Sequence, residues 1–377
     1  MGSGTDRDTL MVRALRLLNQ GLVGDQWDWR TPPDAARGMM AIQAQDYTGA
    51  KLALALRSGF PPEEEVDRAI ANGEIVRSRP SRGTLQFAAP EDMHWLTDLM
   101  AGRSIEAAAK RRAQIGVTDE MLAASEQVLR ETLSGGRVAS RSQVLEAFGN
   151  ANLPSSGHQA SHILSHHTAS MNIVFGAPRD KEETFALADE WITGPRTLDR
   201  EIALSELAER FFTTRGPATA QDLGNWAHLR MTAVREAIEI AGESLVTVEI
   251  GGVTHYLGAR SAGADGIGDD EIAAALSQPL LLPPFDEFLI SYRNRDAILD
   301  PGDLERVIPG RNGMFMPIIV VGGKVAGVWK RTLRATCVKI ELRPFGKLPK
   351  TVLKQLDRVI ADYGRYLGLD TETEVAD

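Results

Sequence analysis

Two glutamines separated by one residue are the side chains in this sequence best suited to share a chemical task. Gln43 and Gln45 each carry an amide that offers an acceptor oxygen and two N–H donors. On a continuous helix two such residues point to different sides, whereas in an extended segment they point to one side. Residues 32–42 are typical of a short helix that Thr31 caps and two prolines begin. If that helix ends near Gln43, both amides converge on one site. The alternative is that they are polar residues at a helix end.

Three histidines form a second set of candidate ligands. His158, His162 and His166 are spaced four apart, so on a helix they line one face, and neutral imidazoles can bind zinc. Three ligands on consecutive turns extend too far to close around one ion, however, and no His-Glu-x-x-His pattern accompanies them. Contact with a nucleic-acid backbone and a solvated face are the alternatives, and we expect no metal. The sequence also lacks a Walker A loop, a Rossmann fingerprint and a Gly-x-Ser-x-Gly turn, and we expect no cofactor.

The elements that must position these residues recur in one order, helices followed by a strand pair, which is the layout of a winged helix. Ser140, Thr219 and Thr232 are predicted helix N-caps. We therefore predict an α+β protein with about three tandem winged helices, of which the first carries both glutamines. The predicted strand pairs lie at 75–80 with 83–87, 173–175 with 185–188, and 245–250 with 253–257, and the predicted domains at 1–100, 101–200 and 201–262.

Strand patterns dominate the last predicted domain, residues 263–377. Residues 317–321 and 325–329 are apolar and flank Gly322-Gly323, which predicts a hairpin. We expect a small β-barrel or sheet, closed by an amphipathic helix at 352–367. The acidic end after Asp370 is predicted to be disordered.

Composition and charge indicate a soluble globular protein. Hydrophobic residues make up 43% and charged residues 25% of the chain, and the single cysteine, Cys337, excludes a disulfide within one chain. No signal pattern or membrane span is recognisable, so we expect a cytoplasmic protein. A net charge of −9 argues mildly against a nucleic-acid partner, but basic residues gather in clusters that could form one basic surface. These clusters are Arg77, Arg79 and Arg82; Lys110 to Arg112; Arg293 and Arg295; and Lys330, Arg331 and Arg334.

Four motifs together resemble a known family, the AlkZ-like winged-helix DNA glycosylases. They are Gln43-Ala44-Gln45-Asp46, Arg82-Gly83-Thr84-Leu85-Gln86, Leu282-Pro283-Pro284-Phe285-Asp286-Glu287 and Gly327-Val328-Trp329-Lys330-Arg331. The resemblance covers most of the chain in the same order. It implies tandem winged helices and a β-barrel around a DNA channel, and a catalytic role for the residues at Gln43 and Gln45. Gln86 departs from the pattern, since family members often carry His there.

The activity that this resemblance implies is excision of N7-alkylated purines, including bulky adducts and interstrand crosslinks. Amides are not general bases near pH 7, but they can hold and orient a water molecule. That suffices when the leaving base is already cationic, as an N7-alkylated purine is. We expect Asp46 to act as a helix cap or an electrostatic helper. The expected contacts to double-stranded DNA are Arg79, Arg82, Thr84, Lys330 and Arg331.

Two further functions are compatible with the sequence. A non-catalytic winged-helix regulator would bind DNA through a recognition helix, but the candidate helices at 156–171 and 232–240 are poorly basic. A resistance protein that sequesters an alkylating compound would bind that compound without DNA. We expect a monomer for the glycosylase.

Overall fold

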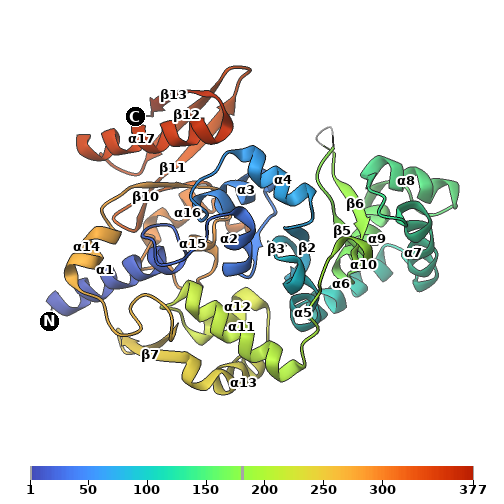
Figure 1. Ribbon diagram of the computed structural model, residues 1–377, viewed down its shortest axis with the longest axis horizontal. Coiled ribbons are helices and arrows are strands. Elements are labelled where there is room, and N and C mark those ends of the chain that lie inside the picture. The colour runs from blue at the N-terminus through green and yellow to red at the C-terminus, as the bar shows by residue number, and fades with distance from the viewer. Residues whose placement is uncertain (1, 180–181, 377) are drawn as a thin grey trace. The chain divides into compact units, whose positions relative to one another are not determined.

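The computed structural model describes residues 2–179 and 182–376, and the chain divides into two compact units. The first unit comprises Met1–Val66 and Leu204–Asp377, and the second comprises Asp67–Ala203. The N-terminal segment therefore packs with the C-terminal segment. Figure 1 labels the elements along the chain.

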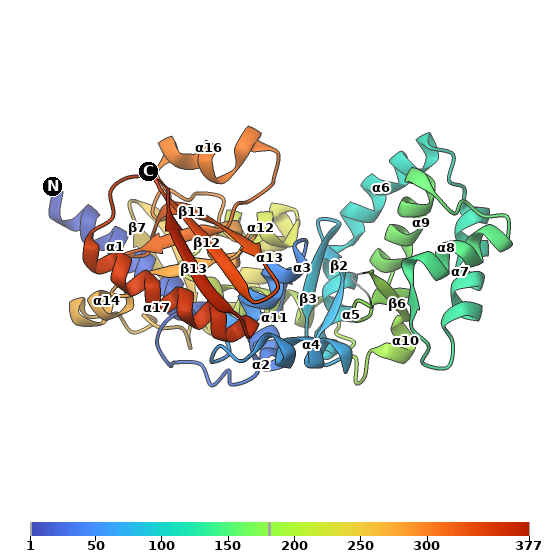
Figure 2. The ribbon, with the colours of Figure 1, turned by 90° about the horizontal axis from the view of Figure 1, so that it is seen from above.

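The second unit is built on an antiparallel sheet whose strands run in the order β3-β2-β5-β6-β4. Helices α7, α8 and α9 gather beside β5 and β6 (Figures 1 and 2). Their order along the chain, with a strand pair after three helices, is the order predicted for residues 101–200. The elements are β2 Val76–Ser81, β3 Thr84–Ala88, α5 Pro90–Met100, α6 Gly102–Gln114, α7 Asp119–Leu133, β4 Ala139–Ser140, α8 Arg141–Asn150, α9 Gly157–Ala169, β5 Ile173–Phe175, β6 Thr184–Leu187 and α10 Ala188–Trp191.

The first unit contains the N-terminal helices, a helical group with its own hairpin, and a C-terminal sheet. The chain passes between the units twice. Helix α4, Glu63–Ala71, contains the first boundary, after Val66, and helix α11, Arg200–Arg215, contains the second, before Leu204. The remaining helices and early strands are α1 Gly2–Asn19, α2 Pro32–Gly38, β1 Ile42–Gln43, α3 Tyr47–Leu56, α11 Arg200–Arg215, α12 Ala220–Ala227, α13 Met231–Ala241, η1 Gly242–Ser244, β7 Leu245–Ile250, β8 Val253–Gly258, α14 Asp269–Ala275, α15 Glu287–Ile290, η2 Pro301–Asp303, α16 Leu304–Val307 and η3 Pro309–Arg311.

Side-chain caps fix where several helices begin, as their sequences predicted. The side chains of Thr31, Ser140 and Thr219 each accept a hydrogen bond from the backbone N–H of the third helical residue. The side chain of that third residue in turn accepts a hydrogen bond from the backbone N–H of the cap residue. The prediction for Thr232 was wrong. Helix α13 begins two residues earlier, at Met231, with Arg230 as its N-cap, so Thr232 lies inside the helix.

The C-terminal strands form an open sheet in the order β13-β12-β11-β10-β9, which is the sheet of the two predicted alternatives and not the closed β-barrel that the resemblance implied. Helix α17 packs against it (Figure 2). The acidic tail is ordered, because β13 pairs in parallel with β12 and its Glu372 and Glu374 form ion pairs with Arg334 and Lys339. The elements are β9 Leu280–Leu282, β10 Ile318–Val321, β11 Lys324–Leu333, β12 Cys337–Pro344, α17 Lys350–Leu367 and β13 Asp370–Val375.

Across residues 2–179 and 182–376, no helix combines the length and the apolar composition needed to cross a membrane.

Candidate active site

Gln43 and Gln45 lie between two helices, Gln43 at the end of strand β1 and Gln45 at a bend just before α3. Helix α2 ends at Gly38, and Met40 adopts a left-handed conformation with φ 63° that turns the chain into β1. The backbone is still extended at Asp46, with φ −93° and ψ 106°. Gln43 retains 8% exposure, and Gln45 is exposed. That both amides face one site stays a prediction.

A buried carboxylate lies against the backbone of Gln43. Glu287 Oε1 accepts a hydrogen bond of 3.0 Å from the Gln43 backbone N–H. The other oxygen, Oε2, accepts bonds from Ser291 Oγ at 2.7 Å and Trp226 Nε1 at 2.9 Å, and from the Arg215 guanidinium at 3.2 and 3.3 Å. Burial raises the pKa of Glu287, but Arg215, Ser291 and the Gln43 N–H outweigh it and hold the pKa below its ordinary value. The carboxylate is therefore ionised at neutral pH.

Arg215 holds the preceding residues of the same segment. Its Nη1 donates to the Met39 carbonyl at 3.1 Å and its Nη2 to the Ala41 carbonyl at 2.8 Å, while the guanidinium lies 4.6 Å from the Trp226 ring centroid. Arg215 and Glu287 are both almost fully buried. The ion pair therefore makes hydrogen bonds to the backbone of residues 39, 41 and 43.

Asp286, the neighbour of Glu287, binds the far end of the helix that follows the glutamines. Its two oxygens accept bonds of 2.8 and 2.9 Å from the Arg57 guanidinium, just after α3, and both side chains are buried. At the start of α3, a Cβ on Gly49 would lie 3.1 Å from Pro284 ring atoms, so the helix packs tightly there. Residues 284–287 therefore contact α3 at both ends as well as the strand before it.

Asp46 caps α3, as predicted. Its Oδ1 accepts from the Gly49 N–H at 2.7 Å and from Thr48 Oγ1 at 3.0 Å. Thr48 Oγ1 also accepts from Arg331, whose other terminal nitrogen donates to Tyr363 OH. Burial lowers the pKa of Arg331, but Tyr363, Asp46 and Glu63 outweigh it, so the pKa is raised. Among the predicted DNA contacts, Arg331 therefore lies beside the glutamine segment.

Lys330 lies next along the same strand, with its side chain exposed and Glu341 as its cross-strand neighbour. The adjacent Trp329 is buried and donates from Nε1 to the Leu282 carbonyl at 2.9 Å. In this way the third and fourth sequence motifs contact each other, and both contact the segment that carries the glutamines.

The other predicted DNA contacts share one hairpin of the second unit. Arg82 and Gly83 both have positive φ, 55° and 67°, and form the two-residue turn between β2 and β3. Arg79 donates to the Gly83 carbonyl at 2.6 Å, and Thr84 Oγ1 donates to the Ser81 carbonyl at 3.2 Å. Burial lowers the pKa of Arg79. The hairpin itself is confirmed, and the contact with DNA stays a prediction.

Gln86, on β3, is 2% exposed, and its Oε1 has no hydrogen-bond partner among the described residues.

The histidine helix is confirmed as α9, and its one fully buried histidine belongs to the core. His167 Nδ1 accepts from Asn172 Nδ2 at 3.0 Å, and Nε2 is 2.7 Å from Ser125 Oγ, which donates to the Leu122 carbonyl. Because the Ser125 hydroxyl proton is used in that bond, Ser125 Oγ accepts from the N–H at Nε2 of His167. Nε2 then carries the ring's one proton and Nδ1 carries none, so the imidazole is neutral. Burial lowers the pKa of His167 to about 4. Within the described residues, no three or more His, Cys, Asp or Glu side chains are arranged to hold a metal ion.

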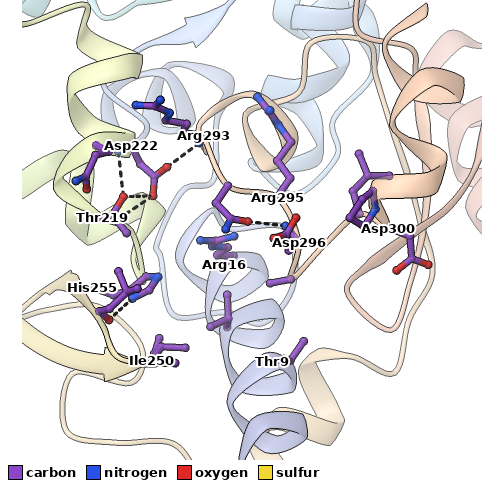
Figure 3. Close-up of a pocket in the computed structure, with 18 of the residues that line it drawn as sticks. Thr9, Arg16, Thr219, Asp222, Ile250, His255, Arg293, Arg295, Asp296 and Asp300 are labelled. Atoms are coloured by element: carbon purple, nitrogen blue, oxygen red, sulfur yellow. Dashed lines mark hydrogen bonds between the residues drawn. The ribbon is translucent and has the colours of Figure 1, made fainter. Parts of the chain in front are cut away.

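A cavity of about 770 Å³ lies elsewhere in the first unit, among α1, the start of α12, the β7–β8 turn and residues 293–304 (Figure 3). None of the predicted site residues is among those that line it. Asp222 accepts from the backbone N–H groups of Thr219 and Arg293, and the Arg16 guanidinium stacks 3.6 Å from the Tyr292 ring centroid, while Arg16 Nη1 has no hydrogen-bond partner among the described residues. The cavity is thus distinct from the glutamine segment.

Comparison with known protein families and structures tests the resemblance. The family model described as "DNA glycosylase AlkZ-like" matches residues 36–366, which include all four motifs. The chain belongs to the AlkZ-like DNA glycosylase family. It is thereby identified as an enzyme that hydrolyses N-glycosyl bonds.

One curated relative and one solved structure of this AlkZ-like family extend the likeness to almost the whole chain. The curated "Interstrand DNA cross-link repair glycosylase" of Streptomyces sahachiroi is 22% identical over 368 residues, which are 90% of this chain and 92% of the relative. The solved structure of the Streptomyces sahachiroi DNA glycosylase AlkZ matches with a TM-score of 0.76 at 21% identity, over 97% of this chain and 99% of that one. The fold is therefore that of AlkZ.

Sequence reasoning missed the buried residues behind the glutamines. Glu287 belongs to a sequence motif, but nothing in the local pattern links it to Gln43. No motif of the sequence assigns a role to Arg215, Trp226 or Ser291. The one available signal was the adjacent acidic pair Asp286-Glu287 directly after an apolar strand pattern, because buried carboxylates require partners.

Proposed function

We propose that the chain hydrolyses the N-glycosidic bond of N7-alkylated purines in double-stranded DNA, including bulky adducts and interstrand crosslinks. Membership of the AlkZ-like family supports the bond class, and the name of the curated relative supports crosslinks as substrates. The observation that carries the proposal is the segment between α2 and α3 with its two glutamines, whose backbone is bonded by the buried, ionised Glu287–Arg215 pair.

The charge of the substrate explains why amides suffice. Alkylation at N7 makes the purine cationic, so its bond to C1′ breaks without prior protonation of the base. As that bond lengthens, the electron pair moves to N9 and neutralises the base, while positive charge develops on the sugar. Gln43 and Gln45 hold a water molecule through their amides and direct their carbonyl dipoles at that charge.

The water completes the reaction. Its oxygen forms a bond to C1′, the C1′–N9 bond breaks, and the surplus proton of the water passes to solvent. The products are the free alkylated base and an abasic site. An amide takes no proton at any step, so the enzyme depends on position and dipoles and not on general-base catalysis.

The proposed DNA contacts come from both units. We propose tandem winged helices that bind the duplex in a channel, with Arg79, Arg82 and Thr84 on one hairpin and Lys330 and Arg331 on β11 contacting phosphates. The protein acts as a monomer in the cytoplasm, on damaged chromosomal DNA.

The test uses a duplex oligonucleotide with one N7-methylguanine, incubated with protein and then with alkali to cut abasic sites. We expect strand cleavage at the lesion, and loss of cleavage with retained DNA binding in the double variant Gln43→Ala/Gln45→Ala. If folded, DNA-binding protein cleaves neither this duplex nor one with a bulkier N7 adduct, the proposal is refuted and a regulator remains.

A further inference from the structure

We infer that Glu287 is a positioning residue for catalysis, which acts by fixing the backbone of Gln43. This inference rests on the proposed function and deepens it. Glu287 does not reach the surface, since it is 1% exposed, so it acts on the substrate only through other residues. Its route to the chemistry is the bond from the Gln43 N–H to Oε1.

The two oxygens of Glu287 have separate tasks. Oε2 accepts from Ser291, Trp226 and Arg215, whereas Oε1 accepts from the backbone of Gln43. The Arg215 guanidinium and the Trp226 indole are donors only. The environment of Oε2 therefore admits only an acceptor, and Oε1 is the oxygen that serves the catalytic segment.

This division makes Glu287→Gln a selective variant. The side-chain amide must place its oxygen where Oε2 lies, because its NH₂ group cannot face the Trp226 and Arg215 donors. The NH₂ group then faces the Gln43 N–H, donor against donor, and the bond to the catalytic segment is lost. The shape of the side chain is nearly unchanged.

The neighbouring contacts explain why that one bond matters. Arg215 fixes the carbonyls of Met39 and Ala41, and Asp46 begins α3, so residues 42–45 are held between two anchors. The hydrogen bond from the Gln43 backbone N–H to Glu287 lies between these anchors, on the residue that carries the first of the two side-chain amides. Misplacing a reacting group by about 1 Å costs on the order of 100-fold in rate.

Single-turnover cleavage of the N7-methylguanine duplex, together with DNA affinity and peptide-resolved hydrogen exchange, tests the inference. For Glu287→Gln we expect a cleavage rate constant lower by roughly 10- to 100-fold, an unchanged Kd for DNA, and faster amide exchange at residues 39–45. Glu287→Asp, whose shorter carboxylate is still an acceptor at both oxygens, should recover part of the rate.

Two control variants separate positioning from general destabilisation. Ser291→Ala removes a donor from Oε2 but leaves the Gln43 bond, so it should reduce the rate less than Glu287→Gln at a similar loss of thermal stability. Asp92→Asn alters a buried carboxylate of the second unit that also accepts from an indole and an arginine, Trp95 and Arg196, and should leave the rate constant unchanged.

The possible outcomes are distinct. Equal cleavage by wild type and Glu287→Gln, or equal losses in Glu287→Gln and Ser291→Ala at matched stability, overturns the inference. If Glu287→Gln does not fold, Glu287→Asp tests the same contact, because its shorter carboxylate draws Oε1 away from the Gln43 N–H, and unchanged cleavage together with unchanged exchange at residues 39–45 overturns the inference. If the wild-type protein cleaves no N7-alkylated duplex, the proposed function fails, and hydrogen exchange at residues 39–45 still tests the contact.

Discussion

The stability of the second unit should depend on pH through His167. The ring accepts from Asn172 at Nδ1 and donates from Nε2 to Ser125, so a second proton on Nδ1 would face the Asn172 NH₂ group. His167 is 1% exposed, and burial, followed by the charges of His166 and Arg112, lowers its pKa from 6.5 to about 4. The folded protein therefore binds the extra proton less readily than the unfolded chain.

The sign and magnitude follow from linkage. Because the folded pKa is below the unfolded one, the contribution is complete above about pH 6.5 and is lost as the pH falls toward 4. At pH 5 the loss is about 2 kcal/mol, and below pH 4 it reaches about 3 kcal/mol. This is a large fraction of the ~5–15 kcal/mol typical of a folded domain.

Urea unfolding followed by far-UV circular dichroism at pH 7 and pH 5 measures this contribution as a difference between variants. His167→Gln removes the titrating group, so its stability should fall less between pH 7 and pH 5 than that of the wild type, by about 2 kcal/mol. His158→Gln, at an exposed position on the same helix, should fall as much as the wild type. Equal pH dependence in wild type and His167→Gln would show that His167 does not resist protonation.

Two other perturbations probe the supports and the DNA contacts. Asp286→Asn leaves the buried Arg57 without its counter-ion and should lower the free energy of unfolding by about 3–5 kcal/mol in urea titrations, while Asp286→Asn with Arg57→Met should recover most of it. A loss below about 1 kcal/mol for the single variant would contradict the assigned ion pair. Lys330→Ala should weaken binding to any duplex and reduce the salt slope of the binding constant by about 1, measured by fluorescence anisotropy. Lys347→Ala, exposed after β12, is the control, and an unchanged slope in Lys330→Ala would exclude its phosphate contact.

Local structure could be predicted where all the residues that determine it lie close together in the sequence. The capping boxes at Thr31, Ser140 and Thr219 consist of residues three apart, so the sequence alone identifies them. At Thr232 the same reasoning failed. The helix begins at Met231 after Arg230, whose side chain makes no capping bond, so a residue type that favours the N-cap position does not by itself fix a helix start.

Features that depend on distant partners could not be predicted. The acidic composition of the tail after Asp370 predicts disorder. In the fold, however, Lys339 on β12 and Arg334 in the turn before β12 form ion pairs with its carboxylates. The open sheet likewise follows from which strands pair, and the strand pattern does not contain that information. For the site, the glutamine pair was visible in the sequence, whereas its anchors Arg215 and Glu287 were not.

The long sequence separation of those anchors has a consequence for how the enzyme is made. Gln43 and Glu287 are 244 positions apart, so a ribosome adding about 5–20 residues per second needs roughly 12–50 s between them. During that interval the nascent chain already contains the glutamines and the β2–β3 hairpin but lacks the carboxylate that fixes Gln43. If the glutamines and Glu287 act as proposed, chemical competence arises late in synthesis, and a fragment truncated before residue 287 would contain both glutamines without the carboxylate that bonds the Gln43 backbone.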